Sequence, residues 1–581
     1  MRNLNVRRPI RRRNVDADRL RQLGDLDPLL GRLFAARGVT DPDDLRLDLK
    51  RLLPVGTLEG VAPAADLIAR HLRAGRRILV VGDFDADGAT STALMVRVLR
   101  GCAADVTYLL PNRFVHGYGL TPGLVEEARA LEPALIVTVD SGIACNPGVA
   151  AARAAGIDVL VTDHHLPPTE LPAANVIVNP NLHGSRFGSR TLAGVGVAFY
   201  VMAALVRQLG QEGWYAKNGL SPPVPARWLD LVALGTVADM VPLDGNNRIL
   251  VNEGLRRLRA GRSTPGISAL LHAAGRNQRD TVASDLGFAA GPRLNAAGRL
   301  DDMSVGVECL LADDAANAAR LAADLSDLNT ERKDIEKRMQ EEALDAVDRL
   351  AARMGDADLP MVLCLHEKNW HAGVVGLVAS RVKDRFHRPV LAFAADGEGG
   401  LKGSARSVRG LHIRDVLADV DARHPGLIER FGGHAMAAGL TLDTSALPKF
   451  QRAVETAVAS RAEDADLSGE LVTDGELPSD RLDLRTAELL RAAGPWGQGF
   501  PEPLFDGVFH VREARIVGER HLRCLLQAEG GQAVVQAIGF GLGGPGHPLP
   551  GAKVRAVYRL DVNEYRGIRA AQLVVEYLEA G

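Results

Sequence analysis

The sequence contains 581 residues, which is too long for one compact core and predicts three or four domains. Its net charge is −3, so any polyanion would have to be held by a local basic patch and not by the overall field. The composition, with 46% hydrophobic and 24% charged residues, is that of a globular protein. No apolar run approaches the roughly 20 residues of a membrane-spanning helix, so no membrane association is expected.

The cysteines and the N-terminus indicate the compartment. Five cysteines are scattered without metal-type pairs, which predicts reduced thiols and a cytoplasmic location. Six arginines lie among the first thirteen residues, but no apolar stretch follows them, so a secretory signal is not expected. This basic arm could touch DNA or be disordered, and disorder is the preferred interpretation. Helices are expected between the arm and about residue 55.

From about residue 60 to 180, short apolar runs alternate with segments of helical length. The predicted strands are Ile78–Val81, Val106–Leu110, Leu135–Val139 and Val159–Thr162. The predicted helices include Thr90–Leu99 and Leu124–Leu131. Alternating βα units predict a doubly wound parallel sheet, in which a ligand binds beyond the carboxyl ends of the strands.

Aspartates follow three of these strands, and another ends a later apolar run. The residues are Asp83, Asp85 and Asp87 in Gly-Asp-Phe-Asp-Ala-Asp-Gly, Asp140 in Val-Asp-Ser-Gly, Asp163 in Asp-His-His, and Asp239 in Gly-Thr-Val-Ala-Asp. If the strands lie side by side, these carboxylates meet, repel one another and raise each other's pKa. A pair of divalent cations is the simplest way to stabilise such a cluster, and two-metal sites cleave phosphoesters.

The first motif has a local interpretation as well. In an extended chain Asp83, Asp85 and Asp87 would point to one face, and a helix beginning at Ala89 would favour an anion at its N-terminus. A calcium-type turn or a solvated loop is the alternative, although no glutamate occupies the closing position of an EF-hand.

The other acidic motifs differ in strength. Asp140 and Asp239 could each be a helix cap or a turn residue. The pair His164 and His165 is harder to explain as structural, and imidazole suits manganese. We assign one histidine as a metal ligand and the other as a partner of a phosphate oxygen or an outer carboxylate.

The second half of the chain changes character twice. Apolar residues at helical spacing over 306–353 predict one long helix, or two, joining the first domain to the next; a coiled-coil dimer seam is the weaker alternative, so a monomer is expected. A smaller α/β unit is predicted over about 358–460, with strands Met361–Leu365, Pro389–Phe393 and Ser404–Val408. Short β runs separated by glycine after about residue 463 predict an OB-type barrel.

Basic residues beside glycines are candidates for binding a phosphate backbone. They are Arg113 and Tyr118 after the second strand, Arg293 and Arg299 in a glycine-punctuated basic loop, Ser404 and Arg406, and Gly433 with His434. Cations beside hydroxyls suit bidentate phosphate contacts, and glycine lets a backbone approach a ligand closely. Any one of these cations could be an ordinary surface charge, but their clustering with glycine favours phosphate binding.

Together, these motifs resemble the DHH phosphoesterase superfamily and, within it, the RecJ family of bacterial single-strand-specific 5′→3′ DNA exonucleases. The resemblance covers nearly the whole chain. It implies an N-terminal arm with helices over 1–55, a DHH catalytic domain over 56–305 and a connecting helix over 306–357. A DHH-associated domain over 358–462 and an OB-type domain over 463–581 would follow.

The resemblance also implies the roles of residues. Two Mn²⁺ or Mg²⁺ ions would be bound, one by Asp85 and Asp140, the other by Asp87, Asp140, His164 and Asp239, with Asp83 and His165 in support. Some relatives have a histidine where this chain has Val81, so Asp83 or water would complete the first ion. The 5′-phosphate and the adjacent backbone would contact Arg113, Arg293 or Arg299, Ser404, Arg406 and His434, while Tyr118 would stack on a base.

The implied activity is the release of mononucleotides from the 5′ end of single-stranded DNA in repair and recombination. Single-strand-binding protein and a DNA helicase would be partners, and the polarity follows from the resemblance alone. The alternatives are a DHH enzyme acting on short oligonucleotides or small nucleotides, a non-catalytic replication factor, and a nucleic-acid-binding protein with an incidental cation site. The C-terminal module favours long strands, and the retention of every carboxylate favours catalysis.

Overall fold

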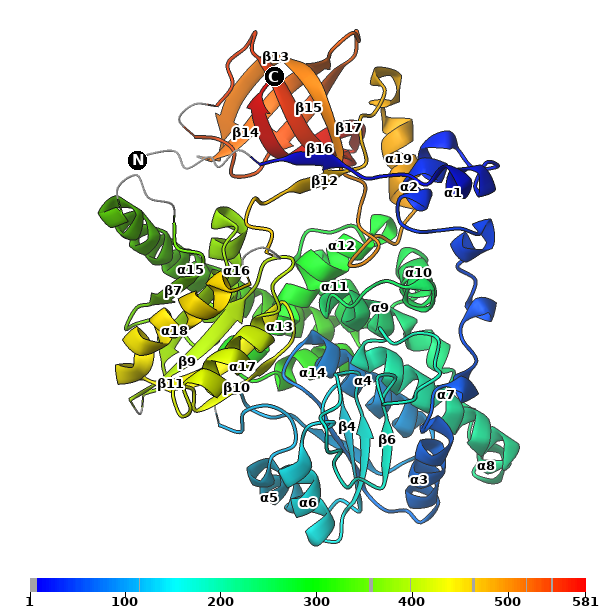
Figure 1. The fold of residues 1–581 in the computed structure, drawn as a ribbon. Helices are drawn as coiled ribbons and strands as arrows, with labels where there is room; N and C mark the ends of the chain where they lie inside the picture. Colours follow the sequence, from blue (N-terminus) through cyan, green and yellow to red (C-terminus); the bar gives the residue numbers. More distant parts are fainter. Residues whose placement is uncertain are drawn as a thin grey trace. The chain divides into compact units, whose positions relative to one another are not determined.

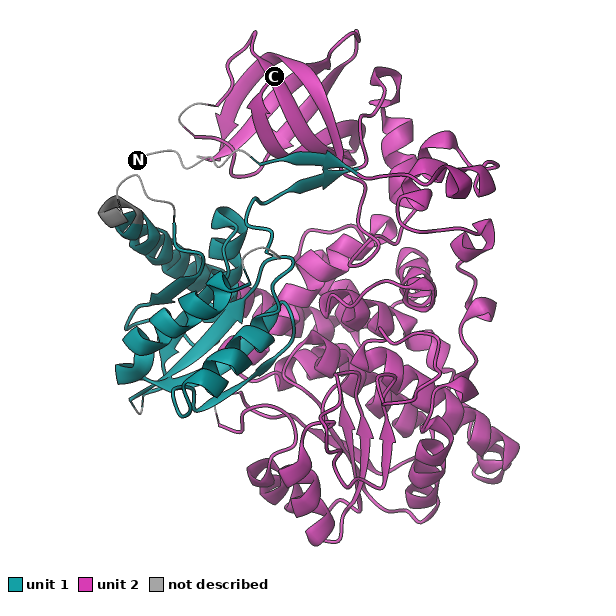
Figure 2. Cartoon of the chain, in the orientation of Figure 1, with its two compact units in different colours: residues 1–12, 330–473 teal, residues 13–329, 474–581 magenta. Residues whose placement is uncertain are grey.

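The computed structural model describes residues 8–113, 115–354, 359–397, 399–461, 465–518, 520–544 and 547–581. The chain forms two compact units, one of residues 1–12 and 330–473 and the other of residues 13–329 and 474–581 (Figure 2). One 40-residue helix, α15 (Ala315–Met354), contributes residues to both units. This helix and α14 (Ser304–Leu311) are the predicted connecting helices.

The larger unit contains a five-stranded parallel sheet with the order β3-β2-β4-β5-β6. Two of its strands, β4 and β6, are labelled in Figure 1. Its strands are β2 (Ile78–Val81), β3 (Val106–Leu109), β4 (Leu135–Val139), β5 (Asp158–Thr162) and β6 (Val176–Val178). The four predicted strands are confirmed to within one residue, whereas β6 was not predicted. The chain adds β3 on one side of β2 and then β4 on the other, so the strand order reverses at β2. The carboxyl ends of β2 and β4 therefore border the crevice where such sheets bind ligands.

Helices cover both faces of this sheet, which confirms the doubly wound α/β fold. Successive side chains of a strand point to opposite faces, so the apolar run of β2 fills two cores. Ile78 and Val80 belong to the larger core, and Leu79 and Val81 belong to the smaller one. The larger core includes α3 (Val61–Arg73), α4 (Ala86–Gly101), α7 (Gly194–Gln211) and α9 (Leu229–Ala238); the smaller core includes α5 (Pro122–Arg129) and α6 (Asn146–Ala154).

Short helices precede the sheet, as predicted. Helix α1 (Ala17–Gln22) is capped by Asp16, and α2 (Pro28–Ala35) is capped by Asp27. In the described part of the chain, no single helix is long and apolar enough to cross a membrane, and one bent pair, Leu49–Thr57 with Val61–Arg73, meets the length and composition requirements.

The predicted basic loop at residues 291–299 is wrong, because this segment forms helix α13 (Gly291–Leu300). Pro292 lies in the first turn, where proline is tolerated, and the buried residues Leu294, Ala296 and Ala297 are good helix formers. A Cβ at Gly298 would lie 1.8 Å from the carbonyl oxygen of Phe84. The glycine therefore serves the close approach of two segments and not a flexible loop.

The smaller unit contains a mixed sheet with the order β10-β11-β9-β8-β7, which confirms the second α/β unit. Its strands are β7 (Leu363–His366), β8 (Val390–Ala395), β9 (Gly400–Arg406), β10 (Arg430–Gly433) and β11 (Ala437–Asp443). Strands β7 and β8 are parallel, and the other neighbours are antiparallel. Its helices are α16 (Val375–Phe386), α17 (Ile413–Arg423) and α18 (Leu447–Ala459).

Part of the basic N-terminal arm is ordered. Strand β1 (Ile10–Arg12) pairs in parallel with β12 (Leu471–Thr473) in the smaller unit. The preferred interpretation of disorder is therefore wrong for these residues, because pairing with a distant strand is not visible in local sequence. Residues 1–7 lie outside the described part of the chain.

The C-terminal region forms a closed five-stranded barrel, as predicted. Its strands, in spatial order, are β13 (Phe505–Val517), β14 (His521–Ala528), β15 (Val534–Gly539), β17 (Ile568–Ala580) and β16 (Lys553–Tyr565). Strand β17 was not predicted, because its alanines and glutamates are poor strand formers.

A buried ion pair holds the start of the barrel region against the N-terminal helices. Arg37 donates two hydrogen bonds to the Asp474 carboxylate, at 3.0 and 2.9 Å, and both side chains are 1% exposed. Asp474 also accepts the Leu504 N–H at 3.0 Å. The Arg37 guanidinium lies 5.1 Å from the Trp496 ring, so charge, hydrogen bonds and an aromatic ring meet at one point.

Replacing Asp474 with alanine would leave the Arg37 charge buried without its partner. We expect this change to lower the free energy of unfolding of the larger unit by about 3–5 kcal/mol. Trp496 lies beside the pair, so its fluorescence during urea unfolding reports the loss. Glu529→Ala, which breaks the exposed pair Glu529–Lys553 on the barrel, is the control and should change little. Equal midpoints for the two variants would contradict this account.

Candidate functional site

The Asp83–Asp87 segment turns directly from strand β2 into helix α4. Asp85 is the N-cap of α4, and its carboxylate accepts the Gly88 N–H at 3.0 Å. Asp87 therefore lies in the first helical turn, where it is buried. The expectation of an extended segment with a helix from Ala89 is wrong: the cap starts the helix three residues earlier, at Ala86. The carboxylates of Asp85 and Asp87 therefore both belong to the turn at the carboxyl end of β2.

Asp140 follows β4 in a strained backbone conformation. Its φ is +58°, in the left-handed region that residues other than glycine rarely adopt. Its carboxylate lies against the start of helix α7, where a Cβ at Gly194 would be 2.6 Å from the Asp140 Cβ. Strain of this kind persists when the surrounding structure enforces it, and it clusters at functional sites.

The N-terminus of α7 also binds a second carboxylate of the cluster. Asp87 accepts hydrogen bonds from the backbone N–H groups of Gly194 at 2.6 Å and Val195 at 3.0 Å. These N–H groups have no partner within the helix, and the helix dipole favours a negative charge there. The segment Gly194-Val-Gly196 is therefore a carboxylate-binding helix start.

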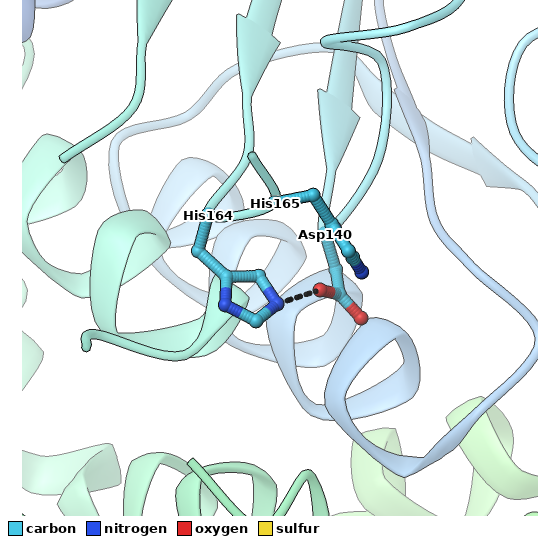
Figure 3. A group of neighbouring side chains, drawn as sticks. All are labelled: Asp140, His164 and His165. Carbon is cyan, nitrogen blue, oxygen red and sulfur yellow. Dashed lines mark ion pairs between the residues drawn. The ribbon is translucent and has the colours of Figure 1, made fainter. Parts of the chain in front are cut away.

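The two adjacent histidines have different surroundings. His164 Nε2 lies 3.1 Å from Asp140 Oδ1, the contact drawn in Figure 3, and 3.5 Å from Asp239 Oδ2. His165 Nδ1 lies 2.7 Å from Asp163 Oδ1. Asp163 also accepts the Ile143 N–H at 2.9 Å, which ties the two loops together. His164 thus enters the carboxylate cluster, and His165 is oriented by Asp163.

Four segments that are distant in sequence converge at this point. Three groups each place one ligand atom per residue within 4.8 Å of the others: Asp83, Asp85 and Asp140; Asp87, His164 and Asp239; and Asp140, His164 and His165. Asp239 lies at the C-terminal end of α9. Overlapping sets of carboxylates with one or two imidazoles are the donors that two Mn²⁺ or Mg²⁺ ions would need.

The carboxylates of the cluster repel one another and would be stabilised by positive charge. Burial, followed by repulsion from neighbouring carboxylates, raises the pKa of Asp87 to about 7 and raises the pKa values of Asp83, Asp140 and Asp239 well above their ordinary range. Asp83 Oδ1 is buried and accepts no hydrogen bond from the described residues. A buried carboxylate oxygen of this kind fits a cation.

Asp163 and His165 behave in the opposite way. Burial alone would raise the pKa of Asp163, but the hydrogen bond and the charge of His165 lower it. Burial would lower the pKa of His165, but the hydrogen bond to Asp163 and the nearby carboxylates raise it to about 9. His165 is therefore positively charged at neutral pH and compensates part of the cluster's charge.

Two of the predicted substrate-binding residues lie at the rim of the cluster. The Arg113 guanidinium lies 4.1 Å from the Phe84 ring centroid, and the Tyr118 hydroxyl donates to the Asp140 carbonyl oxygen at 3.3 Å. Tyr118 is 47% exposed, and its ring lies edge-on to those of Phe84 and His165. An exposed ring and a cation beside the carboxylates are suited to contact a base and a phosphate.

Arg293 and Arg299 lie on helix α13. The Arg293 guanidinium donates to Ser326 Oγ at 2.9 Å and to the carbonyl oxygens of Ala289 at 2.7 Å and Ala273 at 3.3 Å. It therefore braces helices against one another. Arg299 lies in the last turn of α13.

Ser404 and Arg406 lie together on β9 in the smaller unit. Arg406 donates to Ser404 Oγ at 2.9 Å. Both side chains contact the start of helix α16, where a Cβ at Gly376 would lie 2.7 Å from Arg406 Nη2 and 2.9 Å from Ser404 Oγ. A guanidinium, a hydroxyl and the N-terminus of a 12-residue helix together form a cradle suited to a phosphate group.

Gly433 and His434 lie beside this cradle. Ala437 is the register partner of Arg406, and the His434 N–H donates to the Ala437 carbonyl oxygen at 2.8 Å. Gly433 has a φ of +142°, which only glycine adopts easily, and a Cβ there would lie 2.4 Å from the same oxygen. The tight turn thus places His434 next to the end of β9.

Sequence reasoning missed residues that shape the site without chemistry of their own. A Cβ at Gly235 of α9 would lie 2.7 Å from Asp87 Oδ1, so this glycine, like Gly194, lets a helix approach the carboxylates. Asn295 of α13 accepts the Ala86 N–H at 2.8 Å and holds the start of α4. The only available signal was glycine inside apolar helical runs, which marks close packing as often as a loop.

Comparison with known proteins identifies the family to which this architecture belongs. Family models match as the DHH family N-terminal domain over residues 77–236, the DHHA1 domain over 359–460 and the RecJ OB domain over 473–577. The single-stranded-DNA-specific exonuclease RecJ of Escherichia coli is 51% identical over 570 residues, which cover 98% of each chain. The chain belongs to the RecJ family. The Dickeya dadantii RecJ is 52% identical, over 99% of this chain and 100% of its own.

Solved RecJ structures share the fold. The crystal structure of RecJ from Thermus thermophilus in complex with Mn²⁺ matches with a TM-score of 0.78 at 32% identity, over 99% of this chain and 80% of that one. The same protein in complex with Mg²⁺ matches with a TM-score of 0.73 at 30% identity, over 99% and 78% of the two chains. The α/β domains and the barrel described above are thus those of the RecJ fold.

Gly194→Ala tests whether the close approach of α7 builds the cluster. A methyl group at this position would collide with the Asp140 side chain and displace the N–H groups that hold Asp87. We expect Mn²⁺ affinity, measured by isothermal titration calorimetry, to fall by about 10–100-fold, as when groups that orient metal ligands are changed. Gly196→Ala, one half-turn further along α7, is the control because its methyl would meet the movable end of the Leu192 side chain. Unchanged affinity in Gly194→Ala would overturn this reading of α7.

The raised pKa values predict that metal binding depends on pH. Below its pKa of about 7, Asp87 holds a proton that a cation must displace, and burial together with neighbouring carboxylates also raises the pKa values of Asp140 and Asp239 well above their ordinary range. We therefore expect binding to release protons, and the rise in melting temperature caused by Mn²⁺ to be larger at about pH 8 than at about pH 6. Differential scanning fluorimetry with and without Mn²⁺ measures this, and an equal shift at the two pH values would rule it out.

Proposed function

We propose that this chain is a metal-dependent, single-strand-specific DNA exonuclease that hydrolyses phosphodiester bonds and releases mononucleotides from the 5′ end. The convergence of Asp87, Asp140, His164 and Asp239 on one point is the observation that carries the proposal. The proposal is also supported by relatives that share about half of the residues over almost the entire chain and are named single-stranded-DNA-specific exonucleases. The 5′→3′ polarity and a role in DNA repair and recombination are supported by family resemblance.

In this proposal the acidic cluster holds two Mn²⁺ or Mg²⁺ ions. Asp85 and Asp140, with Asp83, would hold one, and Asp87, His164 and Asp239 would hold the other together with Asp140. Val81 is fully buried in the sheet and offers no ligand atom, so the unsatisfied oxygen of Asp83 takes the place of a histidine there. When bound, two such ions supply the positive charge that activates water and stabilises the phosphate during its hydrolysis.

We assign the positioning of the substrate and of the metal ligands to individual residues of the chain. Asp163 orients His165 through the 2.7 Å contact with its Nδ1, which leaves the rest of the imidazole ring to contact the scissile phosphate. Arg113 adds a second cation at the rim, and its contact with Phe84 fixes its direction. Tyr118 offers an exposed ring on which a terminal base stacks. The packing that enforces the strained backbone at Asp140 also keeps its carboxylate in position before substrate arrives.

The cradle in the smaller unit would bind phosphate. We assign Ser404, Arg406 and His434, with the helix start at Gly376, to the 5′-phosphate and the adjacent backbone. Arg406 is half-buried, and burial lowers the pKa of its guanidinium, so an anionic partner would stabilise its charge. Arg299 stays a candidate for the same strand. We assign Arg293 a structural role, since its guanidinium is occupied within the protein.

The domain limits and the partners are part of the proposal. The catalytic domain would span 56–305, the connecting helix 306–357, the phosphate-binding domain 358–462 and the OB-type domain 463–581, after an N-terminal region over 1–55. Single-stranded DNA is the substrate of this assembly. Single-strand-binding protein and a DNA helicase as partners, a cytoplasmic location and a monomeric state are supported by the resemblance and by the sequence.

Asp140→Ala tests the proposal most simply, because Asp140 belongs to both proposed ion sites. We expect the rate of mononucleotide release from a 5′-labelled single strand to fall by more than about 100-fold, since residues that only orient a metal ligand already contribute 10–100-fold. Binding of the strand, measured by fluorescence anisotropy, should remain within a few-fold of the unmodified protein. Asp105→Ala, which removes an exposed carboxylate paired with Arg77, is the matched control. A fully active Asp140→Ala protein would refute the proposal.

A further inference from the structure

The segment that follows Asp239 leaves helix α9 by an unusual path. Met240 adopts a φ of +59° and is 64% exposed, and four residues later Asp244 caps helix α10 (Gly245–Arg259). At the end of α9, the Asp239 N–H donates to the Gly235 carbonyl oxygen at 2.9 Å, and the Met240 N–H donates to the Val237 carbonyl oxygen at 3.3 Å. The carboxylate therefore lies at a helix end, where its position depends on how residues 240–244 are fixed.

A tight turn before the barrel contacts this segment. This turn, Trp496–Phe500, is here named the clamp turn. The Leu243 N–H donates to the Gln498 carbonyl oxygen at 2.7 Å. Two glycines make the approach close enough: a Cβ at Gly499 would lie 3.1 Å from the Pro242 Cβ, and a Cβ at Gly497 would lie 2.7 Å from Leu243 Cδ1. Gly499 also has a φ of +71°.

The clamp turn is itself firmly held. Gly497 and Phe500 exchange backbone hydrogen bonds of 2.9 and 3.1 Å, and Trp496 Nε1 donates to the Leu490 carbonyl oxygen at 2.9 Å. The Phe500 ring stacks on Trp496 at 5.2 Å, and the Arg248 guanidinium of α10 lies 4.1 Å from its centroid. The turn is therefore a rigid support and not a loop that follows its neighbours.

The contacts meet at one short stretch of backbone. From the side of α10, Asn247 Nδ2 donates to the Pro242 carbonyl oxygen at 2.9 Å. From the side of the barrel, the clamp turn holds the next residue, Leu243. The stretch Pro242–Leu243 is thus fixed from two directions, three residues after a carboxylate of the proposed metal site.

We propose that the clamp turn positions Asp239 for metal binding, so that the region leading into the barrel completes the metal site although it contributes no ligand. Gln498, Gly497 and Gly499 are positioning residues, acting through Pro242 and Leu243. This inference rests on the proposed function. Metal binding by the α/β domain then depends on the barrel region. A change in the clamp turn lowers the metal affinity although it alters no ligand.

Gly499→Ala tests this in the full-length protein. The added methyl must push Pro242 away, whereas Gly219→Ala has a similar positive φ of +67° and no atom within 4 Å of the added methyl. The control therefore carries the same kind of backbone strain without the contact. Mn²⁺ binding is measured by electron paramagnetic resonance below the melting temperature of each variant, together with kcat and KM on a single strand.

We expect the dissociation constant of the weaker Mn²⁺ to rise about tenfold in Gly499→Ala, at the low end of the range for groups that orient metal ligands. The kcat at limiting Mn²⁺ should fall in proportion and recover at saturating Mn²⁺, with the KM for the strand unchanged. Gly219→Ala should retain the Mn²⁺ affinity of the unmodified protein. Gly497→Ala would place a methyl 2.7 Å from Cδ1 and 3.1 Å from Cγ of the buried Leu243, so the whole side chain must shift. It should show a smaller change in the same direction, and it decides the test if Gly499→Ala does not fold.

Equal Mn²⁺ affinities in Gly499→Ala and Gly219→Ala would overturn the inference, and so would an unchanged affinity in Gly497→Ala if it is the variant that decides. A loss of thermal stability at unchanged affinity would likewise reduce the clamp turn to a structural contact. The failure of the proposed function looks different, because the unmodified protein would then neither bind Mn²⁺ at this cluster nor release nucleotides.

Discussion

The structure depends on the crowding of five carboxylates at one edge of a parallel sheet. Strand order reverses at β2, and the turns that follow β2 and β4 bring Asp83, Asp85, Asp87 and Asp140 within reach of Asp239 from α9. Each of these side chains is at least partly removed from water, so their repulsion is weakly screened. Backbone N–H groups at the start of α7 and the charge of His165 compensate for part of it. The repulsion that remains would be relieved by bound cations, so the crowding of the carboxylates favours metal binding.

Glycines beside the cluster follow from the same requirement. At Gly194, Gly235 and Gly298, helices approach the loops of the cluster so closely that a single methyl group would collide with a carboxylate or a backbone oxygen. Packing of this density leaves little freedom for the carboxylates to move apart. The helices around the sheet thus hold the carboxylates close together, and the contacts of Pro242 and Leu243 with the clamp turn connect the segment after Asp239 to the barrel region.

Sequence alone predicted those parts of the fold that are encoded locally. The β-branched runs gave four strands of the parallel sheet to within a residue, and topology then placed their aspartates at one edge. Features that depend on distant partners were missed or misread: the strand at Ile10–Arg12 exists through its pairing with β12, and α13 was taken for a loop because its glycines serve contacts across the fold. The roles of individual residues could be distinguished only in the structure. Arg293 is occupied by helix contacts, and His164 and His165, adjacent in sequence, face different partners.

Anomalous diffraction from crystals of the protein soaked in Mn²⁺ would locate the ions among the carboxylates. We expect two manganese peaks, one among Asp83, Asp85 and Asp140 and the other among Asp87, His164 and Asp239, with Asp140 contacting both. Manganese bound only elsewhere, or a cluster that stays free of manganese at saturating concentration, would show that these carboxylates are not a two-metal site.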